Sequence, residues 1–321
     1  MKKVLFATTA LVMTAGVASA EVTLDGLAMF GVISDERKAS GDDFVLQHNV
    51  DLFVRLRGET DTGLSFGANI DLEDLEDSRQ NSCDPDPGDP DFCTDFTDVD
   101  GDGYPSKQGR NETSGTNVFF GGTYGTMTYG NTDGAFDKRI TEVHRIIGLD
   151  YEMWTENQVD NDDNENILRY DYDMGDLGVS LSYAGEDDAK GISVGYAGTF
   201  ANYGFNVGLA YEDSDDGYLW GASAGTKIAD MIELRTAYWK GEDDTPDQRE
   251  QWDISAAYNA NGILFGANYL MDQDWDEDYY TVFAEYELGE GAKLFAQHGK
   301  RDERRDGDEE KITSMGVSFS F

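Results

Sequence analysis

The stretch at residues 130–166, which begins GNTDGAFDKR and ends DNDDNEN, decides how the rest of the chain must fold. It lies between two segments that are predicted to be strands, 123–130 and 167–173. A connection of this length is far too long for a hairpin turn inside a compact β domain. We therefore expect the strands around it to form a wide closed barrel, with this stretch folded into the bore as its narrowest point.

The chain on either side of that stretch repeats one design. Segments of about ten residues alternate apolar and polar side chains, a Gly- or Asn-containing turn reverses the chain, and every second connection is longer and acidic. Examples are the predicted strands 22–33, 48–57, 204–211 and 218–227. Counting such segments predicts about sixteen strands, an even number, in an all-β antiparallel fold.

The alternation favours a transmembrane barrel over a soluble sandwich. In the predicted strand 48–57, one face carries Val50, Leu52, Val54 and Leu56, and the other carries Asp51, Phe53, Arg55 and Arg57. Sixteen such strands have too few bulky apolar residues to fill a sandwich core. A barrel that points apolar residues at lipid and polar residues at water needs no such core. Tyrosines near predicted strand ends, such as Tyr183 and Tyr211, suit a membrane interface, although ordinary strand aromatics would look the same.

The first twenty residues are expected to be a secretory signal peptide. Lys2 and Lys3 give a positive start, residues 4–17 are mostly apolar, and residues 18–20 (ASA) are typical of a cleavage site. The apolar run is shorter than the roughly 20 residues of a membrane-spanning helix, which disfavours an anchor. The mature chain, 21–321, would then be one exported domain, and no later segment is long enough to be a spanning helix.

The charge of the chain excludes one class of partner. It has 65 acidic and 24 basic residues, a formal net charge of −41, which becomes −43 once the two leader lysines are removed. Phosphate binding needs clustered Lys and Arg, so a nucleic-acid partner is excluded. With 17 Tyr, 17 Phe and 5 Trp, the chain is too aromatic for a disordered acidic tail, and we expect it to fold.

The two cysteines lie in one acidic stretch, 74–114. Cys83 and Cys93 bracket the sequence DPDPGDPDF. In an exported protein a short loop of this kind is expected to close as a disulfide, and two free thiols are the alternative. No histidine-rich pattern lies near either cysteine, so a zinc site is not predicted.

A second motif in the same stretch is a calcium candidate. The sequence DVDGDG at 98–103 has oxygen ligands at alternate positions and a glycine at the sharp turn, as in a calcium loop of the EF type. The candidate ligands are the carboxylates of Asp98, Asp100 and Asp102 and the backbone carbonyl of Tyr104. The twelfth position is Gly109 and not Glu, so the bidentate ligand is missing unless Asn111 or Glu112 replaces it. A solvated acidic surface is the other interpretation.

Enzymatic activity is not predicted. The three histidines, His48, His144 and His298, show no spacing to a serine that is typical of a catalytic triad. The glycine-rich sequence GGTYGTMTYG lies within a predicted hairpin and no helix follows it, so it is not a nucleotide-binding loop.

Several motifs together resemble one family. They are the leader, the mature start EVTLDGLAMFGV (21–32), DTGLSFGANIDLED (61–74), VFFGGTYGTMTYGNTDGAFDK (118–138) and the terminal Phe321. This set is similar to the general-diffusion porins of alphaproteobacterial outer membranes. The resemblance implies a sixteen-stranded antiparallel barrel in the outer membrane, assembled as a homotrimer. It also implies that 131–166 is the constriction loop and that 74–114 is a long extracellular loop.

The resemblance further implies that basic wall residues face the acidic loop across the bore. The candidate constriction residues are Asp133, Asp137, Lys138, Arg139, Asp150, Glu152 and Glu156 on the loop, and Arg55, Arg57, Arg169 and Arg235 on the wall. Opposed acids and bases would orient dipolar solutes and give ions of each sign a separate track. Because acids outnumber bases, we predict a preference for cations, although any single carboxylate could instead be solvated loop surface.

Two functions are compatible with these sequence features. The first is a passive channel for small hydrophilic solutes and ions, in contact with outer-membrane lipid and needing no cofactor beyond possible Ca²⁺ in the acidic loops. The second is a substrate-selective channel for sugars or peptides, with an aromatic track such as Trp154, Trp239 and Trp275. A purely structural barrel is a more distant alternative.

Overall fold

The computed structural model describes residues 21–36, 41–72, 116–144, 166–185, 188–201, 203–215, 217–229, 231–243, 248–273, 276–303 and 309–321. Several predicted features lie outside these ranges: the signal peptide, the pair Cys83 and Cys93, the calcium motif Asp98, Asp100, Asp102 and Tyr104, the loop acids Asp150, Glu152 and Glu156, and Trp154 and Trp275. Within the described ranges, no helix has the length and apolar character needed to cross a bilayer.

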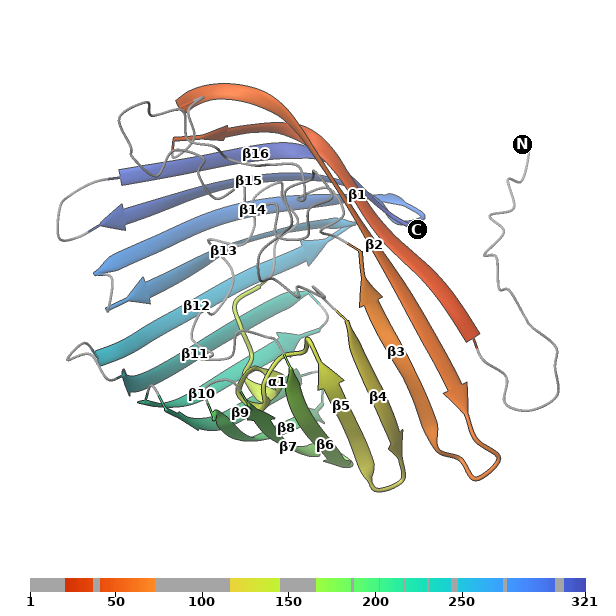
Figure 1. Ribbon diagram of the computed structural model, residues 1–321. Coiled ribbons are helices and arrows are strands. Elements are labelled where there is room, and N and C mark those ends of the chain that lie inside the picture. The colour runs from red at the N-terminus through yellow and green to blue at the C-terminus, as the bar shows by residue number, and fades with distance from the viewer. Residues whose placement is uncertain are drawn as a thin grey trace, which may run out of the picture.

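The described strands form one closed antiparallel barrel (Figure 1). They are β1 (Glu21–Asp35), β2 (Gly41–Glu59), β3 (Ser65–Asp71), β4 (Asn117–Gly122), β5 (Gly125–Gly130), β6 (Ile167–Met174), β7 (Leu177–Ala184), β8 (Lys190–Phe200), β9 (Tyr203–Ser214), β10 (Gly217–Ile228), β11 (Ile232–Asp243), β12 (Gln248–Ala260), β13 (Ile263–Asp272), β14 (Glu277–Gly289), β15 (Ala292–Glu303) and β16 (Glu309–Ser320). Each strand pairs with its neighbours in sequence, so the predicted sixteen-stranded barrel is confirmed.

The first and last strands close the barrel. β1 pairs with β16 over a continuous register that runs from Leu27 opposite Ser320 to Asp35 opposite Ile312. Beyond that register, Gly26 and Phe321 exchange two backbone hydrogen bonds of 2.8 and 3.0 Å. We call this junction the seam. Because β1 and β16 are hydrogen-bonded to each other along the seam, neither strand presents an open sheet edge there.

The side-chain alternation of β9 shows how the sequence fits a membrane. Its outward side chains, Tyr203, Phe205, Val207, Leu209 and Tyr211, are 38–60% exposed, and the residues between them face the interior. An exposed surface of this kind is unfavourable in water and favourable in lipid, with the aromatic residues at both ends of the row.

One rim of the barrel is made of short turns with suitable local chemistry. At the β12–β13 turn, Asn261 and Gly262 both adopt positive φ, 54° and 79°. This geometry matches a two-residue hairpin turn whose twist agrees with the flanking strands, and Asn-Gly is the pair that adopts it most readily. The same residues predict a turn at this position from the sequence alone.

The opposite rim differs from the prediction. The predicted strands 204–211 and 218–227 leave residues 212–217 as an acidic loop, but β9 continues to Ser214 and β10 begins at Gly217. Glu212 and Asp213 are therefore ladder residues, paired with Leu219 and Tyr218. Backbone hydrogen bonds hold the ladder together whatever the side chain, so acidic residues remain in strand conformation near the rim.

Candidate pore constriction

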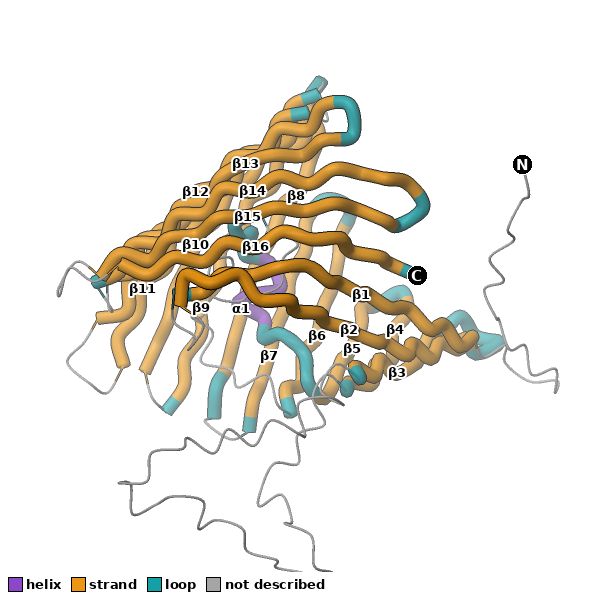
Figure 2. The backbone as a smooth tube through the Cα atoms, turned by 90° about the horizontal axis from the view of Figure 1, so that it is seen from above, coloured by secondary structure: helices purple, strands orange, loops and turns teal. Residues whose placement is uncertain are grey.

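Residues 131–144, which we call the inner segment, leave β5 and lie inside the ring of strands (Figure 2). Helix α1 (Ala135–Arg139) is their one regular element, and it contacts β7, β8 and β9. Five residues are too few for a stable isolated helix, and Gly134 at its N-cap provides no side-chain hydrogen bond. Contacts with the barrel wall must therefore hold the inner segment in place.

Polar contacts fix the start of the inner segment. The side-chain amide nitrogen of Asn117 donates to the backbone carbonyl oxygen of Asn131 at 2.9 Å. The Arg169 guanidinium donates to the Thr132 hydroxyl at 3.0 Å and to the carbonyl oxygen of Asp133. Arg169 is 5% exposed and also forms an ion pair with Asp171, with 3.0 Å between Nε and Oδ2. Its main role in this geometry is to hold the backbone of the inner segment.

Apolar contacts fix the middle of the inner segment. Phe136 is 1% exposed and packs in a buried cluster with Ile140 and, on the wall, Leu219 and Trp239. Trp239 is fully buried in this cluster. The expectation that Trp239 belongs to an aromatic track in the bore is therefore wrong, because the inner segment covers its ring.

Two further predicted pore arginines also bind the inner segment to the wall. The Arg139 guanidinium lies 2.8 Å from Asp173 and donates to the Ser180 hydroxyl at 2.9 Å. The Arg235 guanidinium pairs with Glu233 and donates to the carbonyl oxygen of Val143 at 3.3 Å. Much of the charge of these arginines is therefore offset by neighbouring carboxylates and carbonyls.

His144 ends the described part of the inner segment. Its ring stacks on Phe283, with centroids 5.1 Å apart and planes 2° from parallel. Its backbone N–H donates to the Ser255 hydroxyl at 3.1 Å, and its carbonyl oxygen accepts from Asn268 at 2.9 Å. Burial, and then the nearby charge of Arg235, lower the pKa of His144 below its usual value of 6.5.

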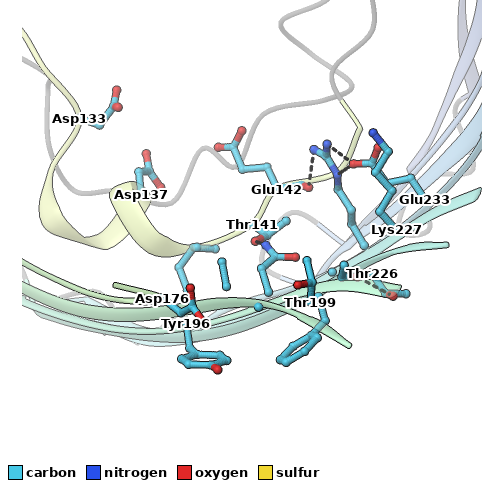
Figure 3. A pocket seen from close by; sticks show the side chains of 18 residues that line it. Asp133, Asp137, Thr141, Glu142, Asp176, Tyr196, Thr199, Thr226, Lys227 and Glu233 are labelled. Carbon is cyan, nitrogen blue, oxygen red and sulfur yellow. Dashed lines mark hydrogen bonds and ion pairs between the residues drawn. The ribbon is translucent and has the colours of Figure 1, made fainter. Parts of the chain in front are cut away.

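A cavity of about 980 Å³ lies beside the inner segment. Its charged lining residues are Asp133, Asp137, Glu142, Asp176, Glu233, Lys227 and Arg235. Figure 3 shows Asp133, Asp137 and Glu142 on the inner segment, with Lys227 and Glu233 on the wall. Five carboxylates thus share this space with two basic groups.

A second cavity, of about 450 Å³, contains the other predicted wall cations. Arg55 and Arg57 line it together with Asp71 and, from the inner segment, Asp133. Arg55 lies 3.3 Å from Asp25, and the Arg57 guanidinium lies 5.1 Å from the centre of the Phe119 ring. The structure therefore brings Asp133, which borders both cavities, to the same space as the two arginines. Lys138 is exposed and lines neither cavity.

Sequence reasoning missed Glu142, Asp176, Lys227 and Glu233 as cavity-lining residues. Glu233 could have been found, because it lies two positions from Arg235 and therefore on the same face of β11. Among the residues that the structure describes, no group of His, Cys, Asp or Glu is placed to hold a metal ion.

Comparison with known proteins identifies the family. Residues 7–306 match the family model of the Gram-negative porins. The chain belongs to this family. It is therefore a porin, a channel-forming barrel of the bacterial outer membrane.

Solved porin structures share this fold at low sequence identity. A porin structure refined at 1.8 Å has 22% identity and a TM-score of 0.68, over 94% of this chain and 100% of that one. A triple mutant of the Rhodopseudomonas blastica porin has 16% identity and a TM-score of 0.66, and another mutant of that porin has 17% and 0.65, both with the same coverage. No curated protein sequence matches this porin.

Proposed function

We propose that this porin is a general-diffusion channel for small hydrophilic solutes and ions that prefers cations. The observation that carries the proposal is the excess of carboxylates over basic groups around the larger cavity. Fixed charges of one sign raise the local concentration of the opposite ion and lower its entry barrier. Arg235 and Glu233 form an ion pair and largely cancel each other, which still leaves four lining carboxylates against the ammonium group of Lys227.

Charges at the cavities should matter more than charges at the rim. At physiological ionic strength the screening length is about 8 Å, so exposed rim carboxylates act on ions only at short range. Asp133 and Asp137 belong to the inner segment and line the larger cavity, where a passing ion would come close to them. We therefore assign the selectivity to these acids, opposed by Arg55 and Arg57.

The lining also supports a broad choice of solute. Thr199, Thr226 and Asn206 line the larger cavity. Their hydroxyl and amide groups can hydrogen-bond many hydrophilic solutes and are not specific for one. The alternative, a sugar- or peptide-selective channel, needed an exposed aromatic track, and Trp239 cannot supply part of it because it is buried. Block of the current by one solute at low concentration would favour that alternative.

We also propose that the porin assembles as a homotrimer. Strands β3 to β7 have only 6–8 residues, whereas a transmembrane strand needs about 9–11. The outer face of these short strands exposes Phe66, Val118 and Phe120. Because the strands are shorter than a transmembrane strand, contact with neighbouring copies of the chain would cover this apolar face better than lipid. Cross-linking in detergent should give a trimer, and only monomers would contradict this proposal.

Single-channel recording in planar bilayers tests the cation preference. The porin should show ohmic steps and a reversal potential toward the cation equilibrium potential under a salt gradient. The double variant Asp133→Asn with Asp137→Asn should lower the cation-to-anion permeability ratio about two- to threefold, since each partly screened charge contributes a few tenths of a kcal/mol.

Two matched variants complete the test. Arg55→Gln with Arg57→Gln should raise the permeability ratio, because it removes positive charge from the smaller cavity. Asp188→Asn should leave it unchanged, because Asp188 lines neither cavity and is paired with Lys190 at 2.7 Å. An unchanged reversal potential in both double variants would place these residues away from the ion path.

A further inference from the structure

A row of small residues crosses the inner wall beneath the inner segment. In the strand register Gly178 pairs with Gly195, Gly195 with Gly208, Gly208 with Ser223, and Ser223 with Ala237. The row, which we call the small-residue row, spans five consecutive strands from β7 to β11. Register partners point to the same side of a sheet, so all five positions face the interior.

The inner segment occupies the space that these residues leave. A Cβ atom on Gly208 would overlap with the carbonyl oxygen of Arg139, which is backbone and cannot rotate away. A Cβ on Gly195 would lie 3.3 Å from the Arg139 side chain. In the next row, a Cβ on Gly221 would come within 2.6 Å of the Phe136 ring. The backbone of α1 thus lies as close to the wall as glycine permits.

Wall serines accept hydrogen bonds from the backbone of the inner segment. The N–H of Ala135 donates to the Ser182 hydroxyl at 2.8 Å, and that of Thr141 donates to the Ser223 hydroxyl at 2.8 Å. The His144 N–H makes a third such bond, to Ser255. These acceptors come from β7, β10 and β12, so the inner segment is attached along its described length.

The attachment uses backbone groups and leaves acidic side chains for the cavity. Arg169, Arg235 and Asn268 donate to carbonyl oxygens of the inner segment, which complements the serine acceptors. Asp133, Asp137 and Glu142 meanwhile line the larger cavity. The depth of the backbone on the wall therefore sets both the open width beside it and the position of these carboxylates.

We propose that Gly208 and the serines Ser182, Ser223 and Ser255 are positioning residues that set the conductance of the channel. Gly208 fixes how close the inner segment lies to the wall, and the serines keep it there. The inference rests on the proposed function, in which acids of the inner segment set the ion selectivity, and it takes that segment as the narrowest part of the pore. It goes further by assigning the pore width to wall residues that never touch the solute.

The first test changes one glycine by a single methyl group. Gly208→Ala should push the Arg139 carbonyl away from the wall and lower the single-channel conductance by about twofold, since pore diameter limits the passage of hydrated ions. Gly185→Ala, one residue beyond the end of β7, is the control, because Gly185 lines neither cavity. A Cβ there would lie 4.0 Å from its nearest neighbour, an ordinary contact, so its conductance should equal that of the wild type.

The second test removes one hydrogen-bond acceptor. Ser223→Ala leaves the Thr141 N–H without its partner, so we expect more open-channel current noise and brief closures, while Ser223→Thr keeps the hydroxyl and should restore steady current. Ser193→Ala is the control, because the Ser193 hydroxyl makes no hydrogen bond in the part of the chain that the structure describes. Heat-modifiable mobility on gels would show that each variant has folded into a barrel.

The outcomes separate this inference from the proposed function. If Gly208→Ala folds with wild-type conductance and Ser223→Ala has wild-type noise, the positioning role is wrong. Cation selectivity that still depends on Asp133 and Asp137 would then leave the proposed function standing. If neither selectivity nor conductance responds to any variant, the inner segment is not the constriction and both proposals fail. Should Gly208→Ala not fold, the Ser223 pair still decides.

Discussion

His144 shows what a single residue contributes to the pore. Its pKa is lowered while the inner segment lies on the wall, so the neutral ring is favoured there. The charged groups that face it are Arg235 and Lys293, which disfavour its protonation, and Glu233 and Glu285, which favour it. His144 takes up a proton more readily when the inner segment is released from the wall than when it is attached. The neutral ring therefore favours attachment at pH values above its ordinary pKa of 6.5, and the attachment weakens as the pH falls below that value.

Current noise should accordingly rise as the pH falls below 6.5. His144→Gln should remove this pH dependence, since glutamine does not titrate in this range. His298→Gln is the control, because His298 is an exposed residue of β15 whose ring nitrogen lies 2.8 Å from the Thr313 hydroxyl on β16. An acid response that persists in His144→Gln would assign it to another group.

Helix α1 depends on the wall more than on its own sequence, and Phe136 is its main apolar contact. Phe136→Ala should weaken the attachment by about 3–5 kcal/mol, the usual cost of emptying a buried phenylalanine site. We expect unstable conductance levels and faster proteolysis within 131–144, both measurable on purified porin. Phe200→Ala, at a 76% exposed site, is the control. Equal proteolysis rates in the two variants would show that Phe136 does not hold the inner segment.

For the secondary-structure elements, the sequence predicted the positions of the strands better than it predicted which groups their side chains contact. Alternation identified the inward face of β2, and Arg55 and Arg57 do line a cavity. It could not show that Arg169 holds a backbone carbonyl, because the period of two gives the face of a side chain and not what lies opposite. The small-residue row could not be predicted, because only the strand register shows that Gly178, Gly195 and Gly208 lie side by side.

For the whole barrel, the outward face must remain apolar while the inward face tolerates charge. Val207 and Asn206 are adjacent on β9, the first on the outer face and the second lining the larger cavity. Val207→Arg should destabilise the folded barrel in lipid by about 2–4 kcal/mol, whereas Asn206→Arg should fold normally and alter selectivity. Folding yield into vesicles, read from gel mobility, distinguishes them. Equal yields would mean that Val207 does not face lipid.

The seam has a consequence for biogenesis. Gly26 and Phe321 lie near opposite ends of the sequence, yet they pair directly. No ring can form until the final residues have been delivered, so the chain must cross the periplasm as an open sheet or an unfolded polymer. Each unpaired backbone group at an open strand edge would cost several kcal/mol in the hydrocarbon layer of the membrane. The barrel must therefore close as it inserts. Until then the exposed strand edges of one chain can pair with those of another, so aggregation competes with closure of the ring.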